Sequence, residues 1–419
     1  MSTSTRGARL FLLALMLVDA IGFGIIAPVI PKLIVQLTGQ ELGEAAALGG
    51  WLMVTYSAMQ FFAAPLLGSL SDAHGRRPVL LGSLAALVLD YLLMATAPAL
   101  AWLFFGRLIA GAAGATYPTA FAVISDTTPA EARAQQFGLL GAAWGTGFIL
   151  GPAIGGLLGS YGPRAPFWFA AGLAAANLLL GLLLFRETLA VENRRPFRWQ
   201  QAHLVGALRA LRAAAPGVTT LLLAVLLYRL AHDAMPATWA FFTMARFGWG
   251  PREIGWSLTF VGVITAIVQA GLIAPIIKAL GERGAALLGF GAGALSMLGY
   301  AFAPNVPALY ACIAVGGLFG VAMPAMNAIM TQRVPANAQG ELQGAVAGIM
   351  SVTAVLSPLL MTQLFRTFAA AAPPLGLALP GAPFIAGALM LAVAMLIARG
   401  AVPAPRAAPA AAYRPPDGA

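Results

Sequence analysis

Three aspartates lie inside long apolar stretches of this chain, and they are the residues best suited to chemistry. Asp19 lies in VDAIGFGII, Asp90 in ALVLDYLLM and Asp233 in LLYRLAHDAMPA. An ionised carboxylate at the centre of a bilayer costs about 2.5–3.5 kcal/mol on insertion scales, so such an acid usually faces a water-filled path or helps to move protons. Each of the three could instead be a paired structural charge. We favour the functional interpretation for Asp19 and Asp90.

Two arginines and a histidine also fall inside apolar stretches. Arg107 lies near the outer end of its stretch, where its long side chain could simply reach the membrane surface. Arg229 and Asp233 are four residues apart on one helix face and could neutralise each other, while His232 beside them would titrate near physiological pH. We give this trio structural and functional roles with equal weight. The candidate proton-coupling residues are therefore Asp19, Asp90, Arg107, Arg229, His232 and Asp233.

The elements that must position these groups are membrane-spanning helices. Of the 419 residues, 60% are hydrophobic and 9% charged, and the mean hydropathy is +0.85; an average soluble domain is about one quarter charged. Apolar stretches of about 20 residues, each long enough to cross a bilayer, recur along the chain. We predict an all-α membrane protein with twelve transmembrane helices, at residues 9–30, 48–70, 78–97, 99–122, 135–159, 164–185, 217–239, 253–275, 284–303, 306–328, 340–364 and 381–399.

Charge and cysteine content exclude several classes of protein. The formal net charge is +10. With both termini placed in the cytoplasm, most of the 24 Lys and Arg residues fall in cytoplasmic segments, so the charge indicates topology and not a nucleic-acid partner. The one cysteine, Cys312, excludes an internal disulfide and a multi-cysteine metal site. No nucleophile–base pair, metal-ligand spacing or phosphate loop is apparent, so we predict no enzyme, no cofactor and no metal.

The chain divides into two groups of six spans. The polar interval 186–216 reads as a cytoplasmic linker between a six-helix half at 1–185 and another at 217–400, and the Pro- and Ala-rich tail 401–419 reads as disordered. A weak repeat supports this division, since Pro65 matches Pro275 at an offset of 210 and Pro98 matches Pro304 at 206. At the offset of 210, Asp19 falls opposite Arg229. Parallel repeats of this kind occur in transporters that bind substrate between the halves.

Three motifs resemble the major facilitator superfamily. The stretch GSLSDAHGRRPVLLG (68–82) resembles the pattern G-x-L-S-D-x-x-G-R-R-P between helices 2 and 3, with every fixed position present. GRLIAGAAGA (106–115) resembles the helix-4 arginine motif. GTGFILGPAIGG (145–156) resembles the helix-5 signature of proton-driven exporters. Together they imply the major facilitator fold, with two pseudo-repeated halves of six helices.

The resemblance implies a role for each motif. The loop would act as a cytoplasmic latch, with Asp72 bound to the N-terminus of helix 11 near Gly340 and Arg76 paired with Asp126. A purely topogenic role for the arginines is the alternative, which leaves Asp72 and the glycines unexplained. In helix 5, small residues and a proline would let helices touch and seal the two halves on the outer side. The latch candidates are Gly68, Asp72, Gly75, Arg76, Arg77 and Asp126, and those of helix 5 are Gly147, Gly151, Pro152, Gly155 and Gly156.

Within the superfamily the chain resembles the bacterial tetracycline–proton antiporters. The stretches VDAIGFGIIAPVIP (18–31), YSAMQFFAAPLLG (56–68) and ISDTTPAEARAQQFG (124–138) carry this likeness. Gln60 and Gln269 match polar positions of those exporters, and Tyr117, Trp239 and Phe242 are further candidates for substrate binding. For the aromatic residues, anchoring at the lipid interface is an equal alternative.

The sequence departs from the tetracycline pattern in its second half. The acid that those exporters carry in helix 9 falls on Gly293, and their helix-8 histidine falls on Thr265. We therefore expect a monomeric, proton-coupled secondary exporter (antiporter) of amphiphilic small molecules, tetracycline-like or multidrug, in a bacterial inner membrane with both termini cytoplasmic. A facilitator or importer of a polar metabolite with the same fold is the alternative. The proton gradient, and no cofactor, would drive transport.

Overall fold

The computed structural model describes residues 3–114, 116–195, 217–370, 373 and 376–401, and these residues form helices and no strand. Residues 196–216 of the predicted linker 186–216, and residues 402–419 of the predicted tail 401–419, lie outside the described residues. The first half consists of α1 (Thr3–Ile26), α2 (Ile30–Thr38), α3 (Leu42–His74), α4 (Arg76–Thr96), α5 (Leu100–Ala112), α6 (Thr116–Thr127), α7 (Ala130–Gly159), α8 (Ala165–Leu184) and a 3-10 turn, η1 (Val191–Asn193).

The second half has the same order of long and interrupted helices. It consists of α10 (Val218–His232), α11 (Ala234–Phe247), α12 (Pro251–Ile267), the π-helical turn η2 (Val268–Leu272), α13 (Ile273–Phe302), α14 (Val306–Gly316), the 3-10 turn η3 (Gly317–Val321), α15 (Ala322–Thr331), the 3-10 turn η4 (Ala336–Ala338), α16 (Gln339–Phe368) and α17 (Ala382–Ala401).

The twelve predicted spans of an all-α membrane protein are confirmed. Ten helical runs among the described residues are long and apolar enough to cross a membrane. One of them, Pro251–Phe302, has 52 residues and contains two predicted spans, since about 20 residues suffice to cross. It bends at Gly281, whose φ of 68° and ψ of 170° lie outside the helical region. The remaining span is α3, which has 33 residues.

Among the described residues, the first and fourth spans of each half are interrupted, so these breaks occupy equivalent places in the two halves. The first span of each half breaks at residues 27–29 and at Asp233. The fourth breaks after Ala112 and, in the second half, at the 3-10 turn η3. Broken helices at matching places in two repeats are typical of the segments that form a transporter's binding site. Asp19, Arg229 and Asp233 all lie on these interrupted spans.

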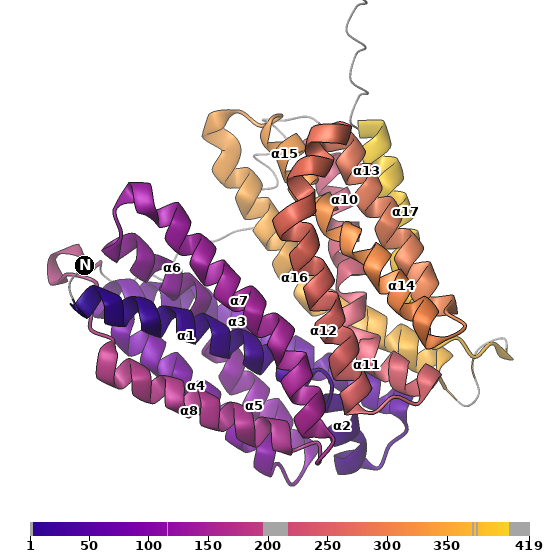
Figure 1. The fold of residues 1–419 in the computed structure, drawn as a ribbon, viewed down its shortest axis with the longest axis horizontal. Coiled ribbons are helices and arrows are strands. Elements are labelled where there is room, and N and C mark those ends of the chain that lie inside the picture. Colours follow the sequence, from indigo (N-terminus) through magenta and orange to yellow (C-terminus); the bar gives the residue numbers. More distant parts are fainter. Residues whose placement is uncertain (1–2, 115, 196–216, 371–372, 374–375, 402–419) are drawn as a thin grey trace, which may run out of the picture.

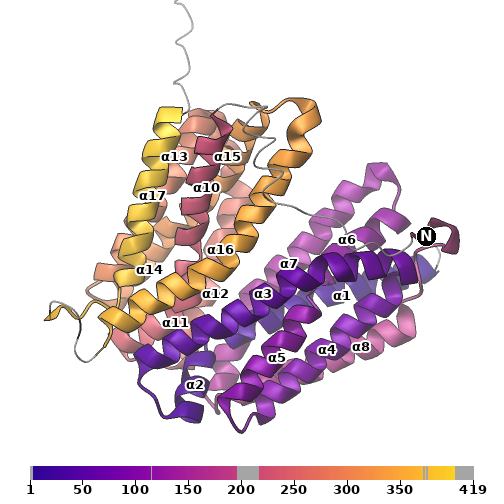
Figure 2. The ribbon, with the colours of Figure 1, turned by 180° about the vertical axis from the view of Figure 1, so that it is seen from behind.

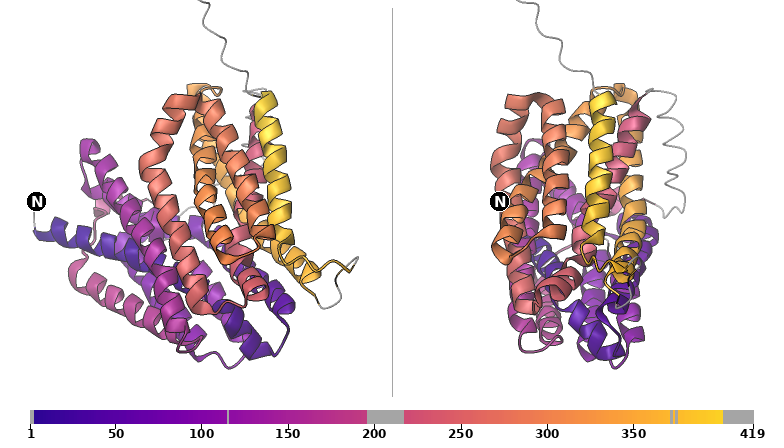
Figure 3. Two further views of the ribbon diagram at one scale, coloured as in Figure 1. Left: turned by 45° about the vertical axis from the view of Figure 1, so that its right-hand side comes forward. Right: turned by 90° about the vertical axis from the view of Figure 1, so that its right-hand side faces the viewer.

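The two halves meet at one end and lean apart at the other. Figures 1 and 2 show the two bundles converging near α2 and α11 and diverging toward α6 and α15. The turned views of Figure 3 show the same two bundles from the side. Across the join, α7 packs on α12 and α3 packs on α16. The contacts involve one end of each helix: Thr259 donates to the Ile149 carbonyl at 3.2 Å, and Arg366 pairs with Glu44 at 2.8 Å.

The hydrophobic core follows this division. One large cluster of buried residues joins Ile25, Val29 and Ile34 of the first half to the core of the second half. A separate cluster, which includes Phe11 and Leu84, fills the first half at its diverging end. The halves therefore share a core only where they converge.

Candidate functional site

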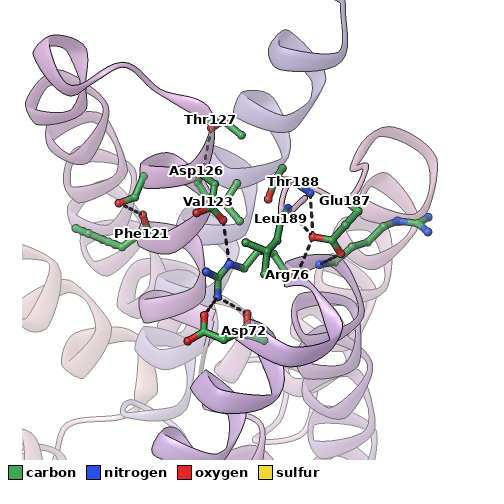
Figure 4. A network of polar contacts seen from close by, with 12 residues as sticks. Asp72, Arg76, Phe121, Val123, Asp126, Thr127, Glu187, Thr188 and Leu189 are labelled. Carbon is green, nitrogen blue, oxygen red and sulfur yellow. Dashed lines mark hydrogen bonds and ion pairs between the residues drawn. The ribbon is translucent and has the colours of Figure 1, made fainter. Parts of the chain in front are cut away.

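The latch residues form a charged network at the diverging end of the first half (Figure 4). The segment predicted as a loop is almost entirely helical, because α3 continues to His74 and α4 begins at Arg76. Only Gly75 separates them, and its φ of 108° explains the need for glycine there. This tight corner brings Arg76 against two acids: Nη1 donates to Asp72 Oδ1 at 2.5 Å and Nε donates to Asp126 Oδ2 at 3.0 Å. The guanidinium thus ties α3 and α4 to the end of α6.

A further acid, Glu187, completes the network, and the sequence analysis missed it. Its carboxylate accepts hydrogen bonds from the backbone N–H groups of Arg76 at 2.9 Å and Arg77 at 3.1 Å, at the N-terminus of α4 (Figure 4). Arg77 in turn donates to the Phe185 carbonyl at 2.7 Å, beyond the end of α8. Partial burial alone would raise the pKa of Glu187, but four backbone N–H donors outweigh it and hold the pKa below its usual range. The sequence did contain a signal for Glu187, since this acid follows directly after a predicted span, in RETL.

Asp72 does not reach the second half in this conformation. Its side-chain partner among the described residues is Arg76, and its side chain is 47% exposed. A Cβ added at Gly340, at the start of α16, would have no heavy atom within 4 Å, and the same holds at Gly68. The expected contact between Asp72 and helix 11 is thus absent while the charged ends are apart.

Inside the membrane, Asp90 and Arg107 form an ion pair between α4 and α5. The Asp90 side chain is fully buried, and Gly106 makes room for it, since a Cβ there would lie 2.6 Å from Asp90 Oδ1. The Arg107 guanidinium also lies 5.7 Å from the centre of the Tyr56 ring. Arg107 therefore points into the bundle and does not extend to the membrane surface.

Asp19 lies in the same group of polar residues but has no cationic partner. The Thr116 side chain of α6 lies beside its carboxylate. No ion pair within the described part of the chain includes Asp19, whereas Asp90 and Asp233 are each paired with an arginine. The pseudo-repeat counterpart, Arg229, pairs within its own helix and not with Asp19.

The trio of the second half surrounds the break between α10 and α11. Asp233 Oδ1 lies 3.3 Å from Arg229 Nη2 and 3.1 Å from His232 Nδ1. Arg229 and His232 lie in the last turn of α10, and Asp233 precedes α11. Each charge thus lies at the helix end whose dipole favours it. The His232 ring lies against Tyr228 and Phe319, whose ring centres are 4.6 Å apart.

Phe319 also explains how the chain accommodates Gly293. A Cβ at Gly293 would lie 2.6 Å from the Phe319 ring and 2.9 Å from Leu391. The position that carries an acid in the tetracycline pattern is therefore filled by its neighbours and has no room for a side chain. Thr265 is half-buried near the end of α12.

The helix-5 glycines serve two different contacts. Gly147, Gly151 and Gly155 pack on α1 of the same half, where added Cβ atoms would lie 2.4–2.7 Å from backbone oxygens. Gly156 instead faces the second half, because a Cβ added there would lie 2.9 Å from the Gly255 Cα. The carbonyl of Pro152 faces Gly255 as well. Within the motif, Pro152 and Gly156 therefore contact the second half, and Gly147, Gly151 and Gly155 pack within the first half.

The predicted substrate residues are distributed over different surroundings. Gln60 donates to the Gly114 carbonyl at 3.2 Å and to the Tyr56 hydroxyl at 3.3 Å, so it joins α3 to the break after α5. Tyr117 is exposed and packs on Phe121, with ring centres 4.6 Å apart. Gln269 is exposed on the π-helical turn η2, a feature frequent at functional sites.

The structure corrects the prediction that Trp239 and Phe242 bind substrate or anchor the protein at the lipid interface. Both are buried in the core of the second half, and the Trp239 indole donates to Ser257 Oγ at 2.9 Å. Their rings pack against Phe384. In this structure neither ring is accessible to a ligand or to lipid, because aromatic residues of α13 and α17 pack against them.

Two six-helix halves that meet at one end, with charged groups on interrupted membrane helices, define a secondary transporter. The chain belongs to the Major Facilitator Superfamily, whose family model matches residues 12–232 and 221–416. This superfamily consists of transporters and not of enzymes, which confirms that prediction.

Individual relatives agree with this assignment. The chain is 37% identical to the class C tetracycline resistance protein of Escherichia coli, over 87% of this chain and 91% of that protein. It is 36% identical to the class G protein of Vibrio anguillarum, over 87% and 92%. Among solved structures, the nucleoside transporter NupG superposes with a TM-score of 0.75 at 14% identity, covering 94% of this chain and 99% of that one. The human organic anion transporter MFSD10 gives 0.66 at 22% identity, over 94% and 99%. The chain is thus a multi-pass transporter related to the tetracycline resistance proteins.

Proposed function

We propose that the protein is a proton-coupled antiporter that exports amphiphilic small molecules, tetracycline-like or multidrug, across a bacterial inner membrane. The relatives' names and their coverage of nearly the whole chain support the substrate class. The diverging end carries the arginine-rich corner at Arg76 and Arg77, and the positive-inside rule supports a cytoplasmic orientation for this end. We propose that both termini are cytoplasmic as well.

The observation that carries the proposal is the unpaired state of Asp19. Asp90 and Asp233 are each ion-paired with an arginine, whereas the neighbour of the Asp19 carboxylate is the neutral Thr116. A carboxyl without a fixed cation can exchange a proton for a cationic group of the substrate. Competition of the two for one carboxylate couples their opposite fluxes. Gln60, Tyr56 and the Asp90–Arg107 pair hold the surrounding helices in place.

The test measures proton movement in inside-out vesicles of a host that lacks other exporters. Adding tetracycline should release protons from acidified vesicles that contain the native protein. Asp19→Asn should abolish this substrate-induced proton movement, and Asp19→Glu, the matched control, should retain part of it because the carboxyl is kept. Normal proton movement by Asp19→Asn would indicate that Asp90 or the α10 trio, and not Asp19, couples the two fluxes. If the native protein equilibrates a polar metabolite and moves no protons, it is a facilitator.

A further inference from the structure

Three aromatic rings, two of them exposed and the third, Trp144, half-buried, form a surface beside Asp19. Phe23 of α1 and Trp144 and Phe148 of α7 lie with ring centres 6.1–6.4 Å apart. Phe23 and Phe148 are nearly parallel, at 24°, and Trp144 stands edge-on to both. Phe23 is 49% exposed and Phe148 39%. We call these three rings the aromatic shelf.

The packing of α7 shows which way the shelf faces. This helix contacts α1 through Gly147 and α12 through Gly156, which leaves two exposed stripes between these contacts. One stripe carries Leu150 and Leu157, large aliphatic side chains suited to lipid. The other carries Phe148 with Gly141 and Gly145, which lie seven and three residues before it and therefore on the same face. The shelf thus lies on the side of α7 away from the leucine stripe.

The packing of α1 places Asp19 on the same side. Phe23 follows Asp19 by four residues, so the two side chains neighbour each other on one helix face. Asp19 contacts Thr116 of α6, and the neighbouring positions Ala20 and Gly24 contact α7. Phe23 therefore lies between α6 and α7, next to the carboxylate.

The shelf has free space in front of it. Cβ atoms added at Gly141 and Gly145 would have no heavy atom within 4 Å, in contrast to the five glycines of α7 that pack on α1 or α12. Exposed aromatic faces beside an unpaired carboxylate are complementary to one kind of ligand. The ring faces attract flat apolar groups and cations, and the carboxylate attracts a positive charge.

We propose that the aromatic shelf and Asp19 together bind planar aromatic compounds that carry a positive charge. The ring system packs on Phe23 and Phe148, and the cationic group lies against the Asp19 carboxylate. This inference rests on the proposed function, since it identifies the substrate that competes with the proton at Asp19. It makes the shelf the determinant of substrate specificity and leaves the proton step to Asp19.

The first experiment measures equilibrium binding to purified protein in detergent, where no proton gradient exists. The probes are ethidium, a planar aromatic cation, and phenanthridine, its uncharged parent ring system, at pH 8. We expect Phe23→Leu and Phe148→Leu each to weaken ethidium binding about tenfold, since a stacking or cation–π contact is lost. Phe62→Leu is the matched control, because Phe62 is 68% exposed on α3 and belongs to a different aromatic pair. Thermal unfolding of each variant checks that folding is unchanged.

The second experiment separates charge from stacking. Asp19→Asn should weaken the binding of ethidium and leave that of phenanthridine unchanged, whereas Phe148→Leu should weaken both. Native affinity for ethidium in both Leu variants would overturn the proposal. An equal loss of ethidium affinity in Phe62→Leu would also overturn it. Because binding is measured without protons moving, loss of ethidium affinity in the Leu variants supports the shelf even if vesicles with Asp19→Asn still move protons, a result that would refute only the proposed coupling.

Discussion

The charged side chains inside the membrane are organised by their partners. Asp90 is paired with Arg107 across two helices, and Asp233 is paired with Arg229 along one helix. A buried carboxylate is strongly unfavourable without such a partner. Asp19 is the exception among the three acids, and it is also the one beside the exposed aromatic shelf. The contrast supports the exchanging role that we propose for Asp19 and suggests a structural role for the pairs as the hypothesis to test.

The Asp90–Arg107 pair leads to a prediction about stability. Arg107→Leu should destabilise the detergent-solubilised protein by about 3–5 kcal/mol, because it leaves a buried carboxylate unpaired. The double variant Asp90→Asn, Arg107→Leu should regain most of this stability but not transport. Thermal unfolding, followed as loss of the monodisperse peak in size-exclusion chromatography, measures both effects. Arg252→Leu is the control, since Arg252 is exposed and forms no ion pair in the described chain. If Arg107→Leu alone is as stable as the native protein, the pair has no structural role.

At the scale of elements, hydropathy alone predicted the twelve spans but not their interruptions. Apolar runs are read over about 20 residues, whereas the break at Asp233 and the turn η3 each involve only one to five residues. Hydropathy also gave no information on which side of each helix faces its neighbours. Asp90 and Arg107 are 17 residues apart on two helices, and their contact depends on how α4 and α5 face each other. The positions of Trp239 and Phe242 were mistaken for the same reason, since an aromatic residue in a span gives no indication of its neighbours.

The contact between α7 and α12 gives a prediction for one element. Gly156→Ala would place a Cβ 2.7 Å from the Pro251 carbonyl oxygen, so the convergent end should open. We expect slower export and a solute leak, with faster labelling of a cysteine introduced at Thr259, in a Cys312→Ser background. Gly138→Ala on the same helix is the matched control, because its Cβ would meet no atom within 4 Å. Equal labelling of the two variants would show that Gly156 is not required for closure.

At the scale of the whole molecule, the two halves must exchange their closed and open ends for a substrate to cross. Here they are joined through α7 with α12 and α3 with α16, and they diverge toward α6 and α15 (Figures 1 and 2). The closed end is held by glycine contacts and by the Glu44–Arg366 pair. The open end carries the Asp72–Arg76–Asp126 network, which is already assembled within the first half. We expect closure of that end to bring the start of α16 toward Asp72.

The latch prediction tests this closure. Asp72→Asn should destabilise the state in which the charged ends meet, because a carboxylate at a helix N-terminus contributes about 0.3–2 kcal/mol. Cysteines introduced at His74 and Gly340, both exposed here, should crosslink only when these ends come together. In a Cys312→Ser background we expect Asp72→Asn to lower the rate of crosslinking about threefold to tenfold and to reduce export in parallel. Glu131→Gln, an exposed acid in the first turn of α7 at the same end, should change neither. Unchanged crosslinking and export in Asp72→Asn would reduce this corner to a determinant of topology.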